Sequence, residues 1–178
     1  MKVRGYRLAV LGVFLLAALF MSSCVGNIWG LGVKSIEINA PVEKVFKYLE
    51  DPGNYMTYPP VNGKISNVQG QGLGWTCTIN YEYAPRQRIN SDFALVDYVP
   101  NQQLVFKAGN TVEKNDGAYT FILTPTPDGG TRLVWVSEGS VEVPLFVAIT
   151  KWGKAKFDRE YTKFMDDFAG RMKTELEK

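Results

Sequence analysis

Few side chains in this sequence could carry out chemistry on a substrate. The chain has no histidine, so the usual general base and the commonest metal ligand are both missing. Its two cysteines, Cys24 and Cys77, lie in such different contexts that we do not expect a disulfide between them. A zinc site would have to be built from carboxylates and a single thiolate, which is an unusual ligand set for zinc. We therefore expect neither a metal nor a cofactor.

Two internal residues remain as weak candidates for catalysis, Cys77 and Asp97. Cys77 has the same parity as Trp75, so both side chains lie on one face of the predicted strand. No basic residue close by in the sequence would lower the pKa of its thiol, so we expect a buried, inert cysteine. Asp97 shares the parity of Phe93, and a desolvated carboxylate at that position could act as a general base. We expect instead a solvated carboxylate at Asp97, because the turn at Pro100 follows shortly after it.

Cys24 lies in a different setting, at the end of an apolar N-terminal segment. Basic residues precede the apolar run Leu8–Phe20, and Met21–Ser23 then lead directly to Cys24. A basic region, a short apolar region and small residues at the end are typical of a secretory signal. A cysteine directly after two serines resembles the lipobox of bacterial lipoproteins, although Met21 stands where that family prefers leucine. The resemblance implies cleavage before Cys24 and lipidation of its thiol.

This resemblance predicts three segments, namely a signal peptide (1–23), a lipidated tether (24–32) and a folded domain (33–178). The tether is rich in glycine, so we expect it to be flexible. The domain would sit in the cell envelope, lipid-anchored to a membrane outside the cytoplasm. Val25 in place of aspartate resembles the pattern for sorting to the outer membrane, on its periplasmic face. The alternative is an uncleaved anchor whose apolar run continues through Val25.

The charge of the chain gives no sign of a nucleic-acid partner. The formal net charge is +2, but three of the 20 basic residues lie in the signal segment, and the remaining 17 nearly balance 18 acidic residues. No basic stripe interleaved with aromatic residues stands out, and such a stripe is the expected footprint of a nucleic-acid binder. We therefore expect no nucleic acid among the partners.

Strands and one long helix must position the remaining residues. The first strand is expected at Val33–Asn39, and a compact amphipathic helix follows Pro41, with a further helical turn near Tyr55. Alternating apolar and polar residues predict six more strands, at Val61–Val68, Trp75–Tyr83, Arg88–Val99, Leu104–Ala108, Ala118–Thr124 and Thr131–Val143. A stripe of large apolar side chains at helical spacing predicts a long helix over Pro144–Lys178.

Two stretches carry a resemblance to a known superfamily. SIEINAPVEKVFKYLEDPGNY (Ser35–Tyr55) resembles the opening strand, Ala-Pro helix entry and aspartate-proline exit of the SRPBCC superfamily, and GTRLVWVSEGSVEVP (Gly130–Pro144) resembles its last strand. That superfamily includes START lipid-transfer domains, the birch-pollen allergen family, polyketide cyclases and coenzyme Q-binding proteins. The resemblance implies an α+β helix-grip fold. In this fold a curved antiparallel sheet of about seven strands wraps around a long C-terminal helix, and two short helices follow the first strand.

Large apolar side chains mark the predicted inner faces of the strands and the start of the last helix. They are Trp75, Ile79, Tyr81, Phe93, Phe106, Tyr119, Phe121, Leu133, Trp135, Ile149 and Trp152. From spacing alone, an ordinary core is the simpler interpretation of these residues. The resemblance implies instead a cavity between sheet and helix that binds a hydrophobic small molecule.

Three functions stay open at this point. The first is membrane-tethered binding or transfer of a lipid, isoprenoid or quinone without catalysis. The second is an enzyme of the cyclase or dehydrase type that uses a carboxylate or tyrosine in the cavity. The third is a structural lipoprotein whose cavity is filled by its own side chains. Leu145–Trp152 carries more apolar surface than one helix face can bury, so we expect there either the cavity mouth or a surface against the membrane. Phe157–Met172 should be ordinary core.

Overall fold

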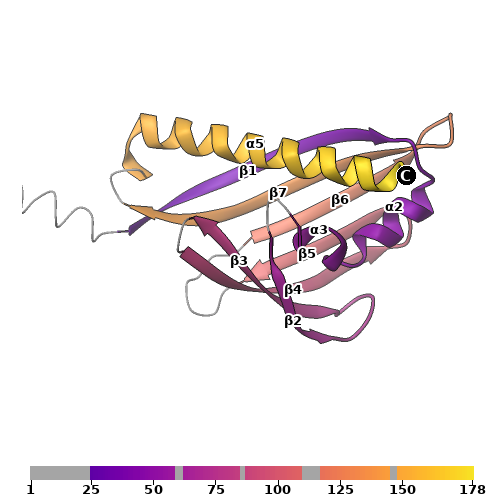
Figure 1. The fold of residues 1–178 in the computed structure, drawn as a ribbon, viewed down its shortest axis with the longest axis horizontal. Coiled ribbons are helices and arrows are strands. Elements are labelled where there is room, and N and C mark those ends of the chain that lie inside the picture. Colours follow the sequence, from indigo (N-terminus) through magenta and orange to yellow (C-terminus); the bar gives the residue numbers. More distant parts are fainter. Residues whose placement is uncertain (1–24, 59–61, 85–86, 110–116, 145–147) are drawn as a thin grey trace, which may run out of the picture.

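The computed structural model describes residues 25–58, 62–84, 87–109, 117–144 and 148–178. One antiparallel sheet of seven strands lies under a long C-terminal helix, which confirms the predicted helix-grip architecture (Figure 1). The strands are β1 (Val25–Ile38), β2 (Lys64–Gln69), β3 (Thr76–Ala84), β4 (Gln87–Val99), β5 (Gln103–Gly109), β6 (Gly117–Pro125) and β7 (Thr131–Pro144). The helices are α2 (Val42–Leu49), α3 (Gly53–Met56) and α5 (Lys151–Leu176).

The order of strands in the sheet is β1-β7-β6-β5-β4-β3-β2. Strands β2 to β7 therefore form a meander in which each strand pairs with its neighbour in the sequence. The first strand closes the sheet by pairing with the last, from Val25 opposite Pro144 to Ile38 opposite Thr131. Among the described helices, none is long and apolar enough to cross a membrane.

Helix α2 follows directly from its sequence pattern. Its apolar residues Val42, Val45, Phe46 and Leu49 recur at helical spacing, and all four are buried. Pro41 takes the N-cap position, where its missing N–H leaves no unpaired donor. Together with α3, this helix fills the connection between the first two strands (Figure 1). Both predicted short helices are thus confirmed.

Strand β1 begins at Val25 rather than at Val33, so the expectation of a flexible tether over residues 25–32 was wrong. This stretch pairs with β7, with Gly32 opposite Ser137. Gly30 and Gly32 instead serve close packing, because a Cβ atom on Gly32 would lie 2.8 Å from Cε1 of Tyr161 in α5. The glycines that suggested flexibility in the sequence allow the helix to approach the strand.

Helix α5 begins at Lys151, and the prediction that it starts at Pro144 was also wrong. Pro144 is the last residue of β7, where it pairs with Val25 at the edge strand. The true start is set by Thr150, whose side chain accepts a hydrogen bond from the backbone N–H of Gly153 at 3.1 Å. This is the usual N-cap arrangement for threonine. The apolar run before it gave no sign of where the strand ends.

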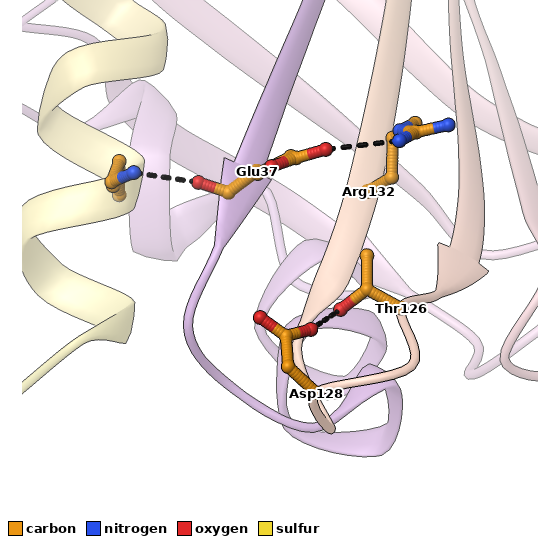
Figure 2. A network of polar contacts seen from close by, with 5 residues as sticks. Glu37, Thr126, Asp128 and Arg132 are labelled. Atoms are coloured by element: carbon orange, nitrogen blue, oxygen red, sulfur yellow. Dashed lines mark hydrogen bonds and ion pairs between the residues drawn. The ribbon is translucent and has the colours of Figure 1, made fainter.

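The C-terminal end of α5 is tied to the sheet by polar contacts that Figure 2 shows from close by. Nζ of Lys173 donates a hydrogen bond to the backbone carbonyl of Glu37 at 2.7 Å. The carboxylate of Glu37 in turn accepts from Arg132 on β7 at 3.0 Å. Next to this pair, Thr126 and Asp128 hold the β6–β7 turn together. Helix, first strand and last strand are therefore joined at one point.

Two further hydrogen bonds fix the same end of the helix. Nζ of Lys44 donates to the carbonyl of Leu176 at 2.7 Å, and the N–H of Asn39 donates to Glu177 at 2.8 Å. Over residues 151–160, by contrast, the described polar side chains bond only within the helix, as in the ion pair between Lys154 and Asp158. The described polar contacts that join α5 to β1 and α2 therefore gather at the C-terminal end of the helix.

Candidate ligand-binding interior

Most of the residues that the sequence placed in the interior do come together there. Trp75, Ile79, Phe93, Phe106, Phe121, Leu133 and Trp135 are buried in one hydrophobic core, and half-buried Tyr119 packs against it. The side chain of Tyr81 lies outside the described part of the structure. Ile149 and Trp152 are not in this core, because 69% and 66% of their surfaces are exposed.

Trp135 on β7 lies at the centre of an array of aromatic rings. It stacks on Phe121 with ring centroids 6.0 Å apart and on Tyr119 at 6.4 Å, both from β6. From the other side, Phe168 of α5 approaches it to 4.5 Å. Such offset pairs contribute about 0.5–1.5 kcal/mol each beyond the burial of their area. The helix and the sheet therefore meet through Trp135.

The array continues across the sheet toward β3. Phe93 on β4 stacks on Tyr119 with centroids 5.7 Å apart and planes only 17° from parallel. Trp75 meets Phe106 edge to face at 6.2 Å, next to the start of β3. Aromatic rings in contact with one another thus extend from the helix to the far strands.

The indole N–H of Trp135 is the one buried side-chain polar atom, within the described residues, that has no hydrogen-bond partner. The residue is only 1% exposed, so solvent does not reach this group. An unpaired buried donor costs about 1–3 kcal/mol, and native proteins keep few of them. Such a donor needs an acceptor that the described residues do not supply, which a bound molecule or an ordered water can provide.

A row of small residues crosses the inner face beside this array. Ala108, Gly117, Gly139 and Gly30 lie in register on four neighbouring strands, and Phe93 is the next residue in the row. A Cβ atom on Gly117 would meet as its nearest neighbours only atoms of the sheet, the closest being the carbonyl oxygen of Glu138 at 3.1 Å. Nothing larger than a methyl group rises from the sheet along these four positions.

Burial along α5 changes from one end to the other. Met165, Phe168 and Met172 are buried, whereas Phe157 and Phe164 are half-buried. The expectation that Phe157–Met172 is ordinary core is therefore met only by its C-terminal half. The aromatic residues of the N-terminal half keep part of their surface accessible.

Two polar groups in the interior, the phenol of Tyr161 and the thiol of Cys77, have raised pKa values. The O–H of Tyr161 donates a hydrogen bond to Oγ of buried Ser137 at 2.5 Å, and burial raises the tyrosine pKa above its usual value. Burial also raises the pKa of the Cys77 thiol to about 12, with Asp51 and Asp92 adding to the effect. At neutral pH both groups stay protonated, so Cys77 is the inert cysteine that its setting in the sequence suggested.

Asp97 is exposed and does not lie with the interior residues. A bulge between Leu95 and Asp97 shifts the register, so the alternation that grouped Asp97 with Phe93 ends there. Its carboxylate accepts hydrogen bonds from Nε2 of Gln103 at 2.7 Å and from the backbone N–H of Tyr98 at 2.8 Å. Within the described residues, the buried polar side chains are serines and a threonine, and no carboxylate is buried. The same residues hold no cluster of potential metal ligands.

The interior also includes a residue that sequence reasoning did not place there, Tyr55 of α3. Its ring packs edge to face against Phe168 at 5.5 Å and against Phe121 at 5.9 Å. Burial raises its pKa well above the usual value, and its O–H lies 3.4 Å from the carbonyl of Leu49. The signal was available, because Tyr55 closes the Asp-Pro-x-x-Tyr exit of the first helix.

A curved antiparallel sheet lies against a long C-terminal helix (Figure 1). Together with the aromatic core between them, this arrangement defines a helix-grip protein. The chain belongs to the polyketide cyclase/dehydrase and lipid transport family, whose sequence profile matches residues 33–177. The resemblance to the SRPBCC superfamily is thereby confirmed. Among curated proteins, no relative matches the sequence.

Several solved structures share the fold at low sequence identity. A conserved protein from Geobacillus kaustophilus is 17% identical with a TM-score of 0.62, and the match covers 83% of this chain and 95% of that one. Protein CV1439 from Chromobacterium violaceum is 16% identical with a TM-score of 0.61, covering 83% and 97%. A protein of unknown function from Staphylococcus aureus, SA2116, is 12% identical with a TM-score of 0.58, covering 85% and 98%. At such identities the likeness establishes the fold and nothing further.

Proposed function

We propose that this protein binds or transfers a hydrophobic small molecule, such as a lipid, isoprenoid or quinone, between the sheet and α5. The family is described by polyketide cyclase and dehydrase activity and by lipid transport, and a hydrophobic ligand is common to these roles. The unpaired indole N–H of Trp135 carries the proposal for this chain, because it is a buried donor without an acceptor. The ligand then has an oxygen acceptor, such as a carbonyl, within an apolar body.

The protein is also a lipoprotein anchored through Cys24 to a membrane outside the cytoplasm, in the cell envelope. Cys24 lies outside the described residues, so this part rests on the lipobox-like sequence Met21–Cys24 and its place after Leu8–Phe20. Sorting to the outer membrane follows from Val25 after the cysteine. The variant Cys24→Ser is expected to accumulate as an unprocessed precursor, and normal maturation of this variant would argue against the anchor.

The ligand is tested by purifying the full-length chain from its own membranes and analysing a solvent extract by mass spectrometry. The acyl chains of the anchor are covalent and stay with the protein, so any extracted lipophile comes from the interior or from loosely held lipid. Trp135→Phe keeps a ring but removes the N–H, and it is expected to weaken retention about 2–10-fold, the value of one hydrogen bond. Tyr58→Phe is the matched control, because it removes one O–H from a ring that is 49% exposed.

The outcome that would overturn the proposal is a wild-type chain that repeatedly carries no lipophile and takes up no lipophilic probe. Equal retention by wild type and Trp135→Phe would leave ligand binding intact and remove the role of the indole N–H.

One observation favours a second candidate, a structural lipoprotein whose interior is filled by its own side chains. The centroids of Trp135 and Phe168 are only 4.5 Å apart, and Tyr55 covers the same ring of Phe168. At this point helix and sheet are in direct contact, as in an ordinary core. The extraction experiment separates the two candidates, because a filled interior yields an empty extract and no probe uptake.

A further inference from the structure

The N-terminal end of α5 exposes large apolar side chains that the fold does not cover. Ile149 and Trp152 are 69% and 66% exposed, and they stand on either side of the N-cap residue Thr150. Single exposed apolar residues are common on protein surfaces, but here two large ones lie within four residues at one end of a helix, and we call them the apolar patch. Tryptophan next to basic residues is typical of membrane interfaces, where its ring lies at the level of the lipid headgroups.

Positive charge surrounds this patch. Between Ala148 and Glu160 the sequence carries Lys151, Lys154, Lys156 and Arg159 against two acids, whereas cations and anions balance over the rest of the helix. The Nζ atom of Lys156 lies 5.8 Å from the centroid of the Trp152 ring, so charge and apolar surface are part of one patch. Lysines beside an exposed tryptophan favour an anionic lipid surface over an uncharged protein partner.

The register of the sheet brings the start of β1 to the same end of the molecule. Val25, the first residue of β1, pairs with Pro144, the last residue of β7, and α5 begins shortly after that residue. Figure 1 shows β1 and α5 starting at the same end of the sheet. Because residues 25–32 are part of a strand and not a loose tether, Cys24 is separated from this end by no flexible linker.

We propose that the N-terminal end of α5, with Ile149, Trp152, Lys151 and Lys154, is a docking surface for an anionic phospholipid membrane. This inference rests on the lipid anchor at Cys24 proposed above. The anchor holds the sheet end at the bilayer, and the two apolar side chains enter the headgroup region while the lysines meet lipid phosphates. The half-buried aromatic rings of α5 then face the membrane from which a hydrophobic ligand would come.

The test uses the full-length chain reconstituted through its own anchor into vesicles of phosphatidylcholine and phosphatidylglycerol. Phosphatidylcholine brominated near the glycerol end of its acyl chains quenches tryptophan that reaches the interface. The emission of Trp152 is obtained by subtracting the spectrum of Trp152→Phe from that of the wild type. We expect this emission to be blue-shifted on the vesicles and quenched by the brominated lipid. Replacing Lys151 and Lys154 by glutamine is expected to lower the ratio of docked to undocked domain about fivefold for each lysine.

Leu73 provides a matched control, because it is 65% exposed and lies in the turn between β2 and β3, remote from the patch. A tryptophan introduced by Leu73→Trp in the Trp152→Phe background should stay unquenched. Equal quenching at both positions would overturn the inference, because it would mean nonspecific contact with lipid.

The remaining outcomes separate the docking surface from the proposed function. If the chain floats with the vesicles and carries a lipophile while Trp152 is not quenched, the docking surface is wrong and the proposed function stands. A blue shift without quenching also overturns the docking surface, because a second copy or the chain's own apolar segment would then cover Trp152. If the chain does not float at all, the anchor and the docking surface both fail.

Discussion

Replacing Gly32 by alanine is expected to destabilise the protein, because α5 approaches β1 most closely at this residue. The added Cβ atom would lie 2.8 Å from Cε1 of Tyr161 and 3.2 Å from Cε of Met165. The methionine can turn away, but the tyrosine ring is held by the bond from its O–H to Ser137 at 2.5 Å. Moving the ring therefore strains or breaks a partly buried hydrogen bond.

The magnitude follows from two opposing effects. Overpacking in a well-packed interior costs about 1–3 kcal/mol. Replacing glycine by alanine recovers about 0.4–1 kcal/mol by restricting the unfolded chain. A net loss of about 1–2 kcal/mol in the free energy of unfolding remains, and at about 2–4 °C per kcal/mol this lowers the melting temperature measurably. Urea unfolding of the full-length chain, in the same detergent for every variant, measures the difference.

Two further variants test the cause of the loss. Gly170→Ala is the control for the substitution itself, because a Cβ atom there meets nothing within 4 Å and the change should stabilise the helix by up to about 1 kcal/mol. In a Tyr161→Ala background, the ring is gone and Gly32→Ala should cost nothing. A Gly32→Ala variant as stable as wild type, or one that costs the same in both backgrounds, would refute the packing argument.

Three more predictions concern buried groups. The Cys77 thiol should resist iodoacetamide in the native protein at pH 8, where burial keeps it protonated, and react once the chain is unfolded in urea; equal rates would contradict its burial. The free energy of unfolding should fall as pH rises from 9 toward 12, because Cys77 ionises near pH 9 when unfolded and only near pH 12 when folded; Cys77→Ala should flatten this slope. Thr131→Val should cost about 1–3 kcal/mol, because buried Oγ1 of Thr131 donates to the carbonyl of Ala40 at 2.7 Å. Thr174→Val, which loses an exposed bond to its own helix, should change stability little in the same urea titration, and equal costs would contradict the role of burial.

The elements that the sequence predicted well are those whose pattern is local. Helix α2 follows from the spacing of its four buried apolar residues, and β3 follows from the alternation of Trp75, Cys77 and Ile79. The start of β1 was missed because its cause is distant in the sequence. Gly30 and Gly32 look like linker residues until the ring of Tyr161 is placed against them.

The candidate site was predicted in its composition but not in its chemistry. Seven of the interior residues that alternation suggested are buried, because period-two alternation reports one face of a sheet directly. The alternation ends at Asp97, where a bulge shifts the register and the carboxylate is exposed, as the nearby turn suggested. The sequence could not show that the indole N–H of Trp135 lacks an acceptor, since that depends on every group packed around it.

The pairing of β1 with β7 also sets the order in which this chain can fold. No residue of β1 has a sheet partner nearer in the sequence than Thr131, which lies opposite Ile38. The strands of the β2–β7 meander can pair with their neighbours while the chain is still emerging from the ribosome. Strand β1 cannot pair until β7, the last strand, has emerged. Contacts between such distant segments slow folding, and until they form β1 keeps an unpaired edge open to aggregation. A chain truncated before β7 would therefore keep its N-terminal strand without a partner, with an edge exposed to aggregation.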